Sequence, residues 1–197
     1  MYLFVKRGYL RKEDNTGGLV KRSLAKLAEY TSRRPETDPA GEVLRTEWGK
    51  PYLSDGSAVF SVSHSGDLWV CLMRASGDEK KERGEGASIG VDIQKIKSCR
   101  AEELAERFFH EAEKRYIMAA GHEDEMIRRF LDLWTEKEAL GKALGRGIGN
   151  SLLSEDVKAL SEDRGFVLIK KDAADGYICT CCVPEAWKDE EIVIKEL

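Results

Sequence analysis

The spacing of apolar residues constrains the fold most, because its period changes several times along the chain without a strict alternation of strands and helices. A period of two predicts strands, and a period near 3.6 predicts helices. Strands are expected up to Tyr9 and at Ala58–Ser63, Leu68–Arg74, Ile89–Gln94, Phe166–Lys170, Tyr177–Val183 and Glu191–Lys195, and helices at Leu19–Tyr30, Glu102–Phe109, Glu111–Ala119 and Asp124–Leu144. This order differs from that of a parallel doubly wound sheet.

We therefore expect an α+β fold of two similar α/β lobes related by a pseudo-twofold axis, each a small, mostly antiparallel sheet with packed helices. The N-terminal lobe is expected to span residues 1–88, and the C-terminal lobe, with the metal and catalytic motifs, residues 89–197. Two polar segments with proline or glycine, Thr31–Gly41 and Ser76–Ser88, are expected to be surface loops. Binding sites commonly form where such lobes meet.

Composition narrows the classes of protein to which the chain can belong. Its 197 residues are 42% hydrophobic, which is enough for one core or two compact halves. A formal charge of −4 gives no support for a general nucleic-acid surface. No apolar run is long enough to cross a bilayer, and the apolar part of Met1–Arg7 is too short for a signal peptide. We expect a cytoplasmic protein that binds neither membranes nor nucleic acids.

The cysteines favour reduced thiols over a disulfide framework, because their number, five, is odd. Cys179 and Cys182 have C-x-x-C spacing, but they lie in an apolar, strand-like run with no second ligand pair at zinc-site spacing. We expect small buried residues in a strand. A zinc-dependent protein built on these cysteines is an alternative with little support.

An acidic residue inside a short apolar run is the first candidate for a site. In a strand, Asp92 and Gln94 share one face while Val91 and Ile93 face the core. An unpaired buried carboxylate is costly, so Asp92 needs a partner or a cation unless it lies at a strand end. Two oxygen-bearing side chains on one face suit a hard cation such as Mg2+.

The helix expected at Asp124–Leu144 carries the second candidate. Glu138 and Lys142 lie four residues apart and therefore occupy one stripe of the helix. Glu138 could supply a second carboxylate to the cation, and Lys142 could meet phosphate charge one turn further on. The same spacing is also typical of an ordinary solvated ion pair on a helix, so the pair by itself does not indicate a site.

Several motifs together resemble the 4′-phosphopantetheinyl transferase family, in particular its larger, two-lobed type, typified by the surfactin-synthetase activating enzyme. They occur in the order typical of the family, over about residues 49–148. They are Gly49–Pro51, Phe60–Ser65, Gly90–Gln94, Arg107–Phe109 with Glu113, Trp134–Ala139 with Lys142, and Gly145–Ile148.

The resemblance implies an enzyme that moves the 4′-phosphopantetheine arm of coenzyme A onto a serine of an apo acyl or peptidyl carrier protein. The reaction depends on Mg2+ and releases adenosine 3′,5′-bisphosphate. Such a chain would be a monomer if its site lies between two lobes of one polypeptide. The alternative is a catalytically weak module that binds coenzyme A or a nucleotide.

The resemblance also implies roles for individual residues. Asp92 and Glu138 would bind Mg2+, and Glu138 would be the base that acts on the carrier serine. Lys142 would contact the diphosphate. The remaining predicted contacts to coenzyme A are those of Ser63 and His64 with phosphate groups, and those of Lys50 and Pro51 with the nucleotide.

Two positions are less sharply defined. Gln94 stands where many relatives have a third acidic ligand, so its amide oxygen would coordinate Mg2+ or a water would take that place. Glu113 could be an auxiliary acid near the metal or a solvated residue on a charged helix.

Overall fold

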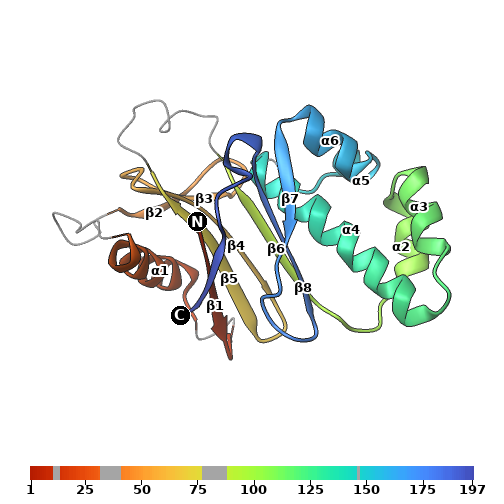
Figure 1. Ribbon diagram of the computed structural model, residues 1–197, viewed down its shortest axis with the longest axis horizontal. Helices are drawn as coiled ribbons and strands as arrows, with labels where there is room; N and C mark the ends of the chain where they lie inside the picture. The colour runs from red at the N-terminus through yellow and green to blue at the C-terminus, as the bar shows by residue number, and fades with distance from the viewer. Residues whose placement is uncertain (11–13, 32–40, 77–87, 146) are drawn as a thin grey trace.

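The computed structural model describes residues 1–10, 14–31, 41–76, 88–145 and 147–197 (Figure 1). Apart from their end residues, the predicted loops Thr31–Gly41 and Ser76–Ser88 lie outside this part of the chain. The strands are β1 (Tyr2–Arg7), β2 (Val43–Arg45), β3 (Pro51–Leu53), β4 (Ala58–Ser65), β5 (Leu68–Ala75), β6 (Gly90–Lys95), β7 (Phe166–Lys170), β8 (Tyr177–Pro184) and β9 (Val193–Glu196). The helices are α1 (Thr16–Tyr30), α2 (Ala101–Phe108), α3 (Glu111–Met118), α4 (Glu123–Ala143), α5 (Asn150–Leu153), α6 (Val157–Asp163) and the short 3-10 helix η2 (Glu185–Trp187).

Four strands form the first sheet in the order β4-β5-β1-β9. β5 pairs antiparallel with both β1 and β4, and β9 pairs parallel with β1. Helix α1 packs on one face of this sheet through Leu19, Val20, Leu24 and Leu27. These apolar residues recur at helical spacing, so one side of α1 is buried.

Helix α1 begins at Thr16, so the prediction of a start at Leu19 is wrong by nearly one turn. Asn15 caps the helix, because its side-chain oxygen accepts a hydrogen bond from the backbone N–H of Gly17 at 2.9 Å. Gly17 and Gly18 have low helix propensity, which is why this turn did not read as helix. The cap outweighs that local preference.

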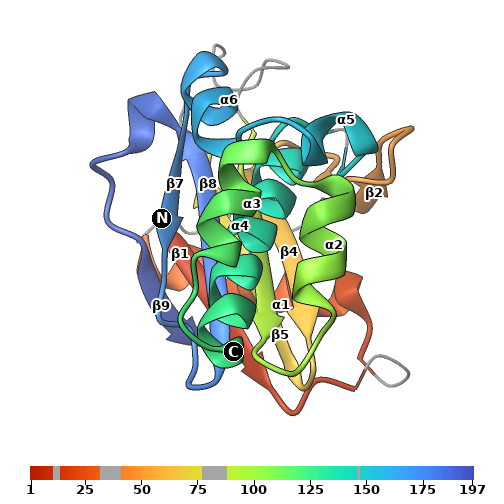
Figure 2. The same cartoon turned by 90° about the vertical axis from the view of Figure 1, so that its right-hand side faces the viewer.

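Three antiparallel strands form the second sheet in the order β6-β8-β7. Helix α4 packs against all three strands, and α2 and α3 pack on α4 (Figures 1 and 2). Gly90 allows β6 and α4 to approach closely, because a Cβ at this position would clash with the carbonyl oxygen of Ala139. The glycine thus brings the start of β6 against the part of α4 that carries Glu138 and Lys142.

The two halves share one plan of strand, helix and hairpin. In the first half β1 is followed by α1 and then by β4 and β5, and the pairing order is β1-β5-β4. In the second half β6 is followed by α4 and then by β7 and β8, and the order is β6-β8-β7. In each half the first strand pairs antiparallel with the last.

The two sheets face each other across a shared apolar core. Its residues from the first sheet are Leu3, Val5, Leu68, Val70 and Leu72, and those from the second are Val91, Ile93, Cys179, Cys181 and Val183. All five cysteines are free, and Cys179, Cys181 and Cys182 are buried, which confirms the prediction of reduced thiols and of small buried residues in a strand.

A ladder of serines joins the sheets along one edge, where β4 lies beside β6 (Figure 1). The hydroxyls of Ser61, Ser63 and Ser65 accept hydrogen bonds from the backbone N–H groups of alternate residues of β6. These donors are Val91 at 3.1 Å, Ile93 at 3.4 Å and Lys95 at 3.0 Å. Side chains of one half therefore satisfy backbone donors of the other half.

The predicted α+β class, with small and mostly antiparallel sheets, is confirmed. The last strand, β9, belongs to the first sheet although its residues fall within the predicted C-terminal lobe. The short helices α5 and α6 were not predicted. In the described part of the chain, no helix has the length and apolar character needed to span a membrane.

Candidate active site

Asp92 is the third residue of β6, and its side chain points away from the core between the sheets. Only 2% of its surface is exposed. Its Oδ1 accepts hydrogen bonds from the Ser63 hydroxyl at 2.7 Å and from Lys142 Nζ at 2.8 Å, and Oδ2 accepts one from Gln94 Nε2 at 3.1 Å. Three donors from three elements therefore hold this buried carboxylate in place.

Lys142 lies in the last turn of α4, where a positive charge also interacts favourably with the helix dipole. Its ammonium donates to the carbonyl oxygen of Val91 at 2.9 Å and to Asp92. An ammonium group has three N–H donors. Within the described residues, two of these donors have a partner, which leaves the third for an anion.

Glu138 lies one turn before Lys142 on the same stripe of α4 and is partly buried. Burial raises the pKa of the Glu138 carboxyl group, and the nearby charge of Asp92 raises it further. Lys142 opposes this shift, so all three groups interact electrostatically. A carboxylate with a raised pKa is a better proton acceptor at neutral pH, as a general base requires.

Ser63 and His64 are adjacent in sequence but lie on opposite sides of β4. Ser63 is buried and points to Asp92, so it belongs to the carboxylate site. His64 is exposed, and its ring centroid lies 5.3 Å from that of Tyr9. Alternation along a strand separates neighbouring side chains in this way. The structure therefore does not bring these two predicted phosphate contacts together.

Gln94 lies next to Asp92, as two residues on one face of a strand should. Its amide nitrogen donates to Asp92, and its amide oxygen Oε1 accepts a hydrogen bond from the Ser65 hydroxyl at 3.3 Å. In this orientation the oxygen that would coordinate a cation is engaged by the serine ladder. Coordination by Gln94 requires rotation of the amide, which would exchange its oxygen and nitrogen.

A cavity of about 200 Å3 adjoins this cluster. Its lining residues are Trp48, Gly49, Lys50, Pro51, Ser61, Val62, Lys142, Gly145 and Gly147. Lys50 and Pro51 thus lie beside Lys142, in a space between the segment before β4 and the end of α4. Burial lowers the pKa of Lys50 to about 8, and the Cys182 thiol opposes that shift.

The two carboxylates fit a magnesium ion, which takes oxygen ligands and often binds a protein through one or two carboxylates, with water and substrate phosphates in the other positions. Asp92 and Glu138 are close enough for the charge of one to shift the pKa of the other. Among the described residues, no group of three or more His, Cys, Asp or Glu side chains could hold a metal ion.

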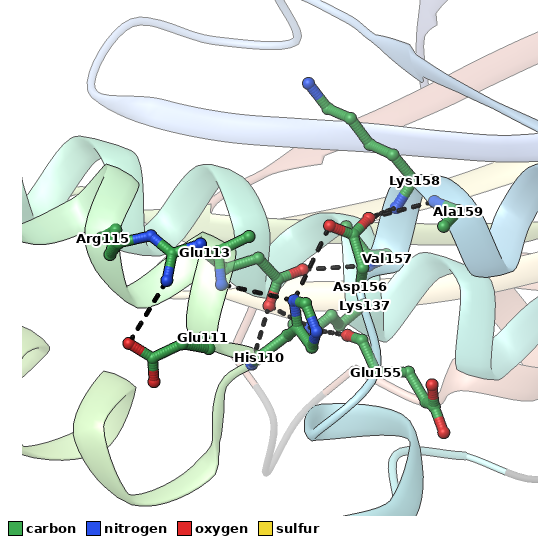
Figure 3. A network of polar contacts seen from close by, with 11 residues as sticks. His110, Glu111, Glu113, Arg115, Lys137, Glu155, Asp156, Val157, Lys158 and Ala159 are labelled. Carbon is green, nitrogen blue, oxygen red and sulfur yellow. Dashed lines mark hydrogen bonds and ion pairs between the residues drawn. The ribbon is translucent and has the colours of Figure 1, made fainter.

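Glu113 lies outside this cluster, and of the two alternatives considered for it, the solvated residue is wrong because the side chain is buried. It is 5% exposed and forms an ion pair with Lys137 at 2.7 Å (Figure 3). It also accepts hydrogen bonds from the backbone N–H groups of Val157 at 2.9 Å and His110 at 3.2 Å. Glu113 therefore joins α3, α4 and α6. Because these donors engage its carboxylate, its role is to hold the three helices together.

Sequence reasoning missed two residues that support this site and one buried lysine outside it. Ser61 and Ser65 complete the ladder that orders β6, and their alternate positions with Ser63 are the only signal for it in the sequence. Lys137 precedes Glu138 but is fully buried on another side of α4. Nothing in its local sequence distinguishes it from a solvated lysine.

Comparison with known proteins places these residues in a family context. Residues 88–191, more than half of the chain, match the 4′-phosphopantetheinyl transferase superfamily. The matched segment includes Asp92, Glu138 and Lys142.

Individual relatives point the same way. The chain is 29% identical over 184 residues to 4′-phosphopantetheinyl transferase Sfp of Bacillus subtilis (strain 168), covering 92% of this chain and 75% of that protein. It is 31% identical over 166 residues to another 4′-phosphopantetheinyl transferase of Bacillus subtilis, and that match covers 83% of this chain and 66% of the relative. The chain is 26% identical over 147 residues to 4′-phosphopantetheinyl transferase gsp of Aneurinibacillus migulanus, and the match covers 70% of this chain and 56% of that protein.

The matched region thus spans between about half and three quarters of these relatives, and less than two thirds of some of them. The family match itself covers the strand and helix that carry the carboxylates and the lysine. On this evidence of sequence, the chain belongs to the 4′-phosphopantetheinyl transferase superfamily.

Proposed function

We propose that this protein transfers the 4′-phosphopantetheine group of coenzyme A to a serine of an apo acyl or peptidyl carrier protein, with Mg2+, and releases adenosine 3′,5′-bisphosphate. The observation that carries the proposal is the cluster of Asp92, Glu138 and Lys142. In it, a lysine with one N–H donor that no described residue accepts lies beside two interacting carboxylates. Family membership and the names of the relatives support the same reaction.

In this reaction the serine oxygen attacks the phosphorus next to the pantetheine arm, and the bond from that phosphorus to the bridging oxygen breaks. Glu138 accepts the serine proton, for which its raised pKa suits it. The spare donor of Lys142 binds a diphosphate oxygen, and the Asp92 carboxylate keeps the ammonium directed toward the site. Bound by Asp92 and Glu138, Mg2+ would neutralise negative charge on the diphosphate.

Ser63 acts on this site through Asp92. Its hydroxyl accepts from the backbone of β6 and donates its proton to the carboxylate, so it holds Asp92 in one rotamer. Lys50, Pro51 and the rest of the 200 Å3 cavity lie where the nucleotide part of coenzyme A is proposed to bind. Gln94 and His64 remain proposed contacts to the metal and to phosphate.

One chain is sufficient for such a site, because residues of both halves line it. Lys50 and Ser63 come from the first half, and Asp92, Glu138 and Lys142 from the second. We therefore propose a monomer. A cytoplasmic location remains a prediction from the sequence.

The decisive experiment incubates the protein with coenzyme A, Mg2+ and a panel of apo carrier proteins, followed by intact mass spectrometry. The expected result is that one carrier protein gains the mass of a single phosphopantetheine group. Adenosine 3′,5′-bisphosphate should be released in an equal molar amount. Binding of coenzyme A without an adduct on any carrier would instead support a catalytically weak binding module. Omission of Mg2+ tests the metal requirement in the same assay.

A further inference from the structure

Lys50 links the hairpin of the antiparallel strands β2 and β3 to the second half of the protein. It lies directly before β3, and its ammonium donates to three oxygens that are remote in sequence. These are the carbonyl of Lys142 at 2.7 Å, the carbonyl of Ile89 at 3.3 Å and the hydroxyl of Ser88. Two of the three are backbone groups at the end of α4 and immediately before β6.

Lys50 and Lys142 differ in how many of their ammonium N–H donors are used by the protein. An ammonium group has three N–H donors and no acceptor. All three donors of Lys50 are used by protein oxygens, whereas Lys142 uses two in the described residues. Lys50 therefore has no donor left for a phosphate of coenzyme A, although its stem lines the cavity.

The acceptors of Lys50 show what it controls. The carbonyl of Lys142 lies in the last turn of α4, where carbonyl oxygens lack part of their intrahelical partners, and it also accepts from Gly145 N–H at 3.2 Å. The carbonyl of Ile89 lies three residues before Asp92. One ammonium thus ties together the backbones that carry the two charged partners Lys142 and Asp92.

Among the described residues, no carboxylate forms an ion pair with Lys50 that would compensate its burial. Burial lowers the pKa of Lys50 to about 8. Burial of a charge without a counter-charge disfavours the fold unless hydrogen bonds replace the lost water. The three oxygens replace the lost water, so the buried ammonium of Lys50 depends on these contacts.

We propose that Lys50 is a positioning residue that sets the place of Lys142 relative to Asp92, and that it does not bind a phosphate of coenzyme A. The inference rests on the proposed function only in so far as Lys142 and Asp92 belong to a transferase site. The tether itself is a property of the free protein and can be measured without any substrate.

The test compares Lys50→Met with the wild type and with Lys188→Met, a control that removes an exposed lysine paired with Glu185 three residues before it. Hydrogen exchange is measured on the free proteins. In Lys50→Met, we expect faster exchange in peptides covering residues 88–93 and 139–145, with no change elsewhere. Lys188→Met should exchange like the wild type throughout.

Kinetics provide the second readout. A displaced Lys142 should lower kcat by up to about a hundredfold, the effect of a misplacement near 1 Å, with a smaller change in the KM for coenzyme A. Loss of a substrate contact would instead raise the KM and leave hydrogen exchange of the free protein unchanged. That second pattern would overturn the proposal.

A backup variant keeps the test decisive if Lys50→Met does not fold. Lys50→Gln retains two N–H donors without the charge, and the same local increase in exchange is expected to a smaller degree. Unchanged exchange in residues 88–93 and 139–145 of this variant would also overturn the proposal. Absence of transfer by the wild type would refute the proposed function, whereas the exchange experiment would still decide the role of Lys50.

Discussion

The two halves of the molecule place different chemistry on the same frame. β1 and β6 each have six residues, and the third residue of each pairs with the last strand of its half, as the pairs Phe4 with Cys71 on β5 and Asp92 with Thr180 on β8 show. Phe4 is fully buried under α1, whereas Asp92 is 2% exposed beneath α4. The first half fills this position with apolar volume, and the second half fills it with a buried carboxylate.

The covering helices repeat the contrast. α1 buries four apolar residues and Ser23, while α4 buries Thr135, Glu136 and Lys137 and carries Glu138 and Lys142 beside the sheet. Burial of polar groups is costly unless partners are supplied, and the first half supplies some of them: Ser63 to Asp92, and Lys50 to the carbonyl of Lys142. One half therefore acts as a scaffold for the chemistry of the other.

The largest expected effect is on catalysis in the second half. Glu138→Gln should lower kcat by about 10²–10⁴-fold, the usual contribution of a general base, because the amide cannot accept the serine proton. Circular dichroism should show an unchanged fold. Transfer at the wild-type rate in the intact-mass assay would remove Glu138 from the role of base.

Substitution of the equivalent strand positions tests the comparison directly. Phe4→Ala should destabilise the protein by about 3–5 kcal/mol, as large-to-small changes in cores do, with normal activity per folded molecule. Asp92→Asn should abolish transfer with a smaller loss of stability, because the side chain of its partner Lys142 is 25% exposed and water can hydrate the ammonium. Denaturant unfolding and transfer assays measure both properties. If the two variants lost stability and activity in equal proportion, the division of roles would be refuted.

The buried ion pair beneath α4 should show that the second half also needs polar residues for stability. Removal of one partner of a buried pair typically costs about 3–5 kcal/mol. Glu113→Gln should approach this loss, because Lys137 would remain buried without a counter-charge at 2.7 Å. Asp163→Asn is the control, since its pair with Arg164 is exposed. Equal unfolding midpoints for the two variants would contradict the structural role of Glu113.

The serine ladder should contribute less. Ser61→Ala leaves the buried N–H of Val91 without its side-chain acceptor, which should cost about 1–3 kcal/mol. Ser65→Ala affects the exposed Lys95, where water can replace the hydroxyl, so its effect should be smaller. Denaturant unfolding provides the measurement. If Ser65→Ala lowered the free energy of unfolding more than Ser61→Ala, burial would not be what makes the hydrogen bonds of the ladder stabilising.

The smallest predicted effect is a pH dependence of stability. The pKa of Glu138 is raised in the folded protein above the ordinary value of 4.5. Below that value the carboxyl group is protonated in both states. As the pH rises through the folded pKa, ionisation increasingly favours the unfolded chain, so stability is lost.

The carboxylate of Glu138 therefore destabilises the fold at neutral pH in the absence of metal. In a metal chelator, Glu138→Gln should unfold at a higher temperature than the wild type at pH 7, and this gain should vanish toward pH 4. Thermal unfolding across this range checks the sign. A gain that increased toward acid pH would contradict the raised pKa.

Local periodicity in the sequence was sufficient for the fold class, for most of the strands and long helices, and for the neighbouring placement of Asp92 with Gln94 and of Glu138 with Lys142. Such pairs depend only on the geometry of one strand or one helix. The start of α1 was missed because a cap outweighed two glycines, and α5 and α6 were missed because they are too short to show a period.

Only the tertiary structure decided how these elements meet. It turned Ser63 toward Asp92 and His64 toward Tyr9, buried Glu113 against Lys137, added β9 to the first sheet, and directed Lys50 to the backbone of residue 142. These contacts join segments that lie far apart along the chain, so they leave no periodic pattern in the sequence. The polar contacts among them arise because burial removes these groups from water, and partners from distant segments replace the lost hydrogen bonds.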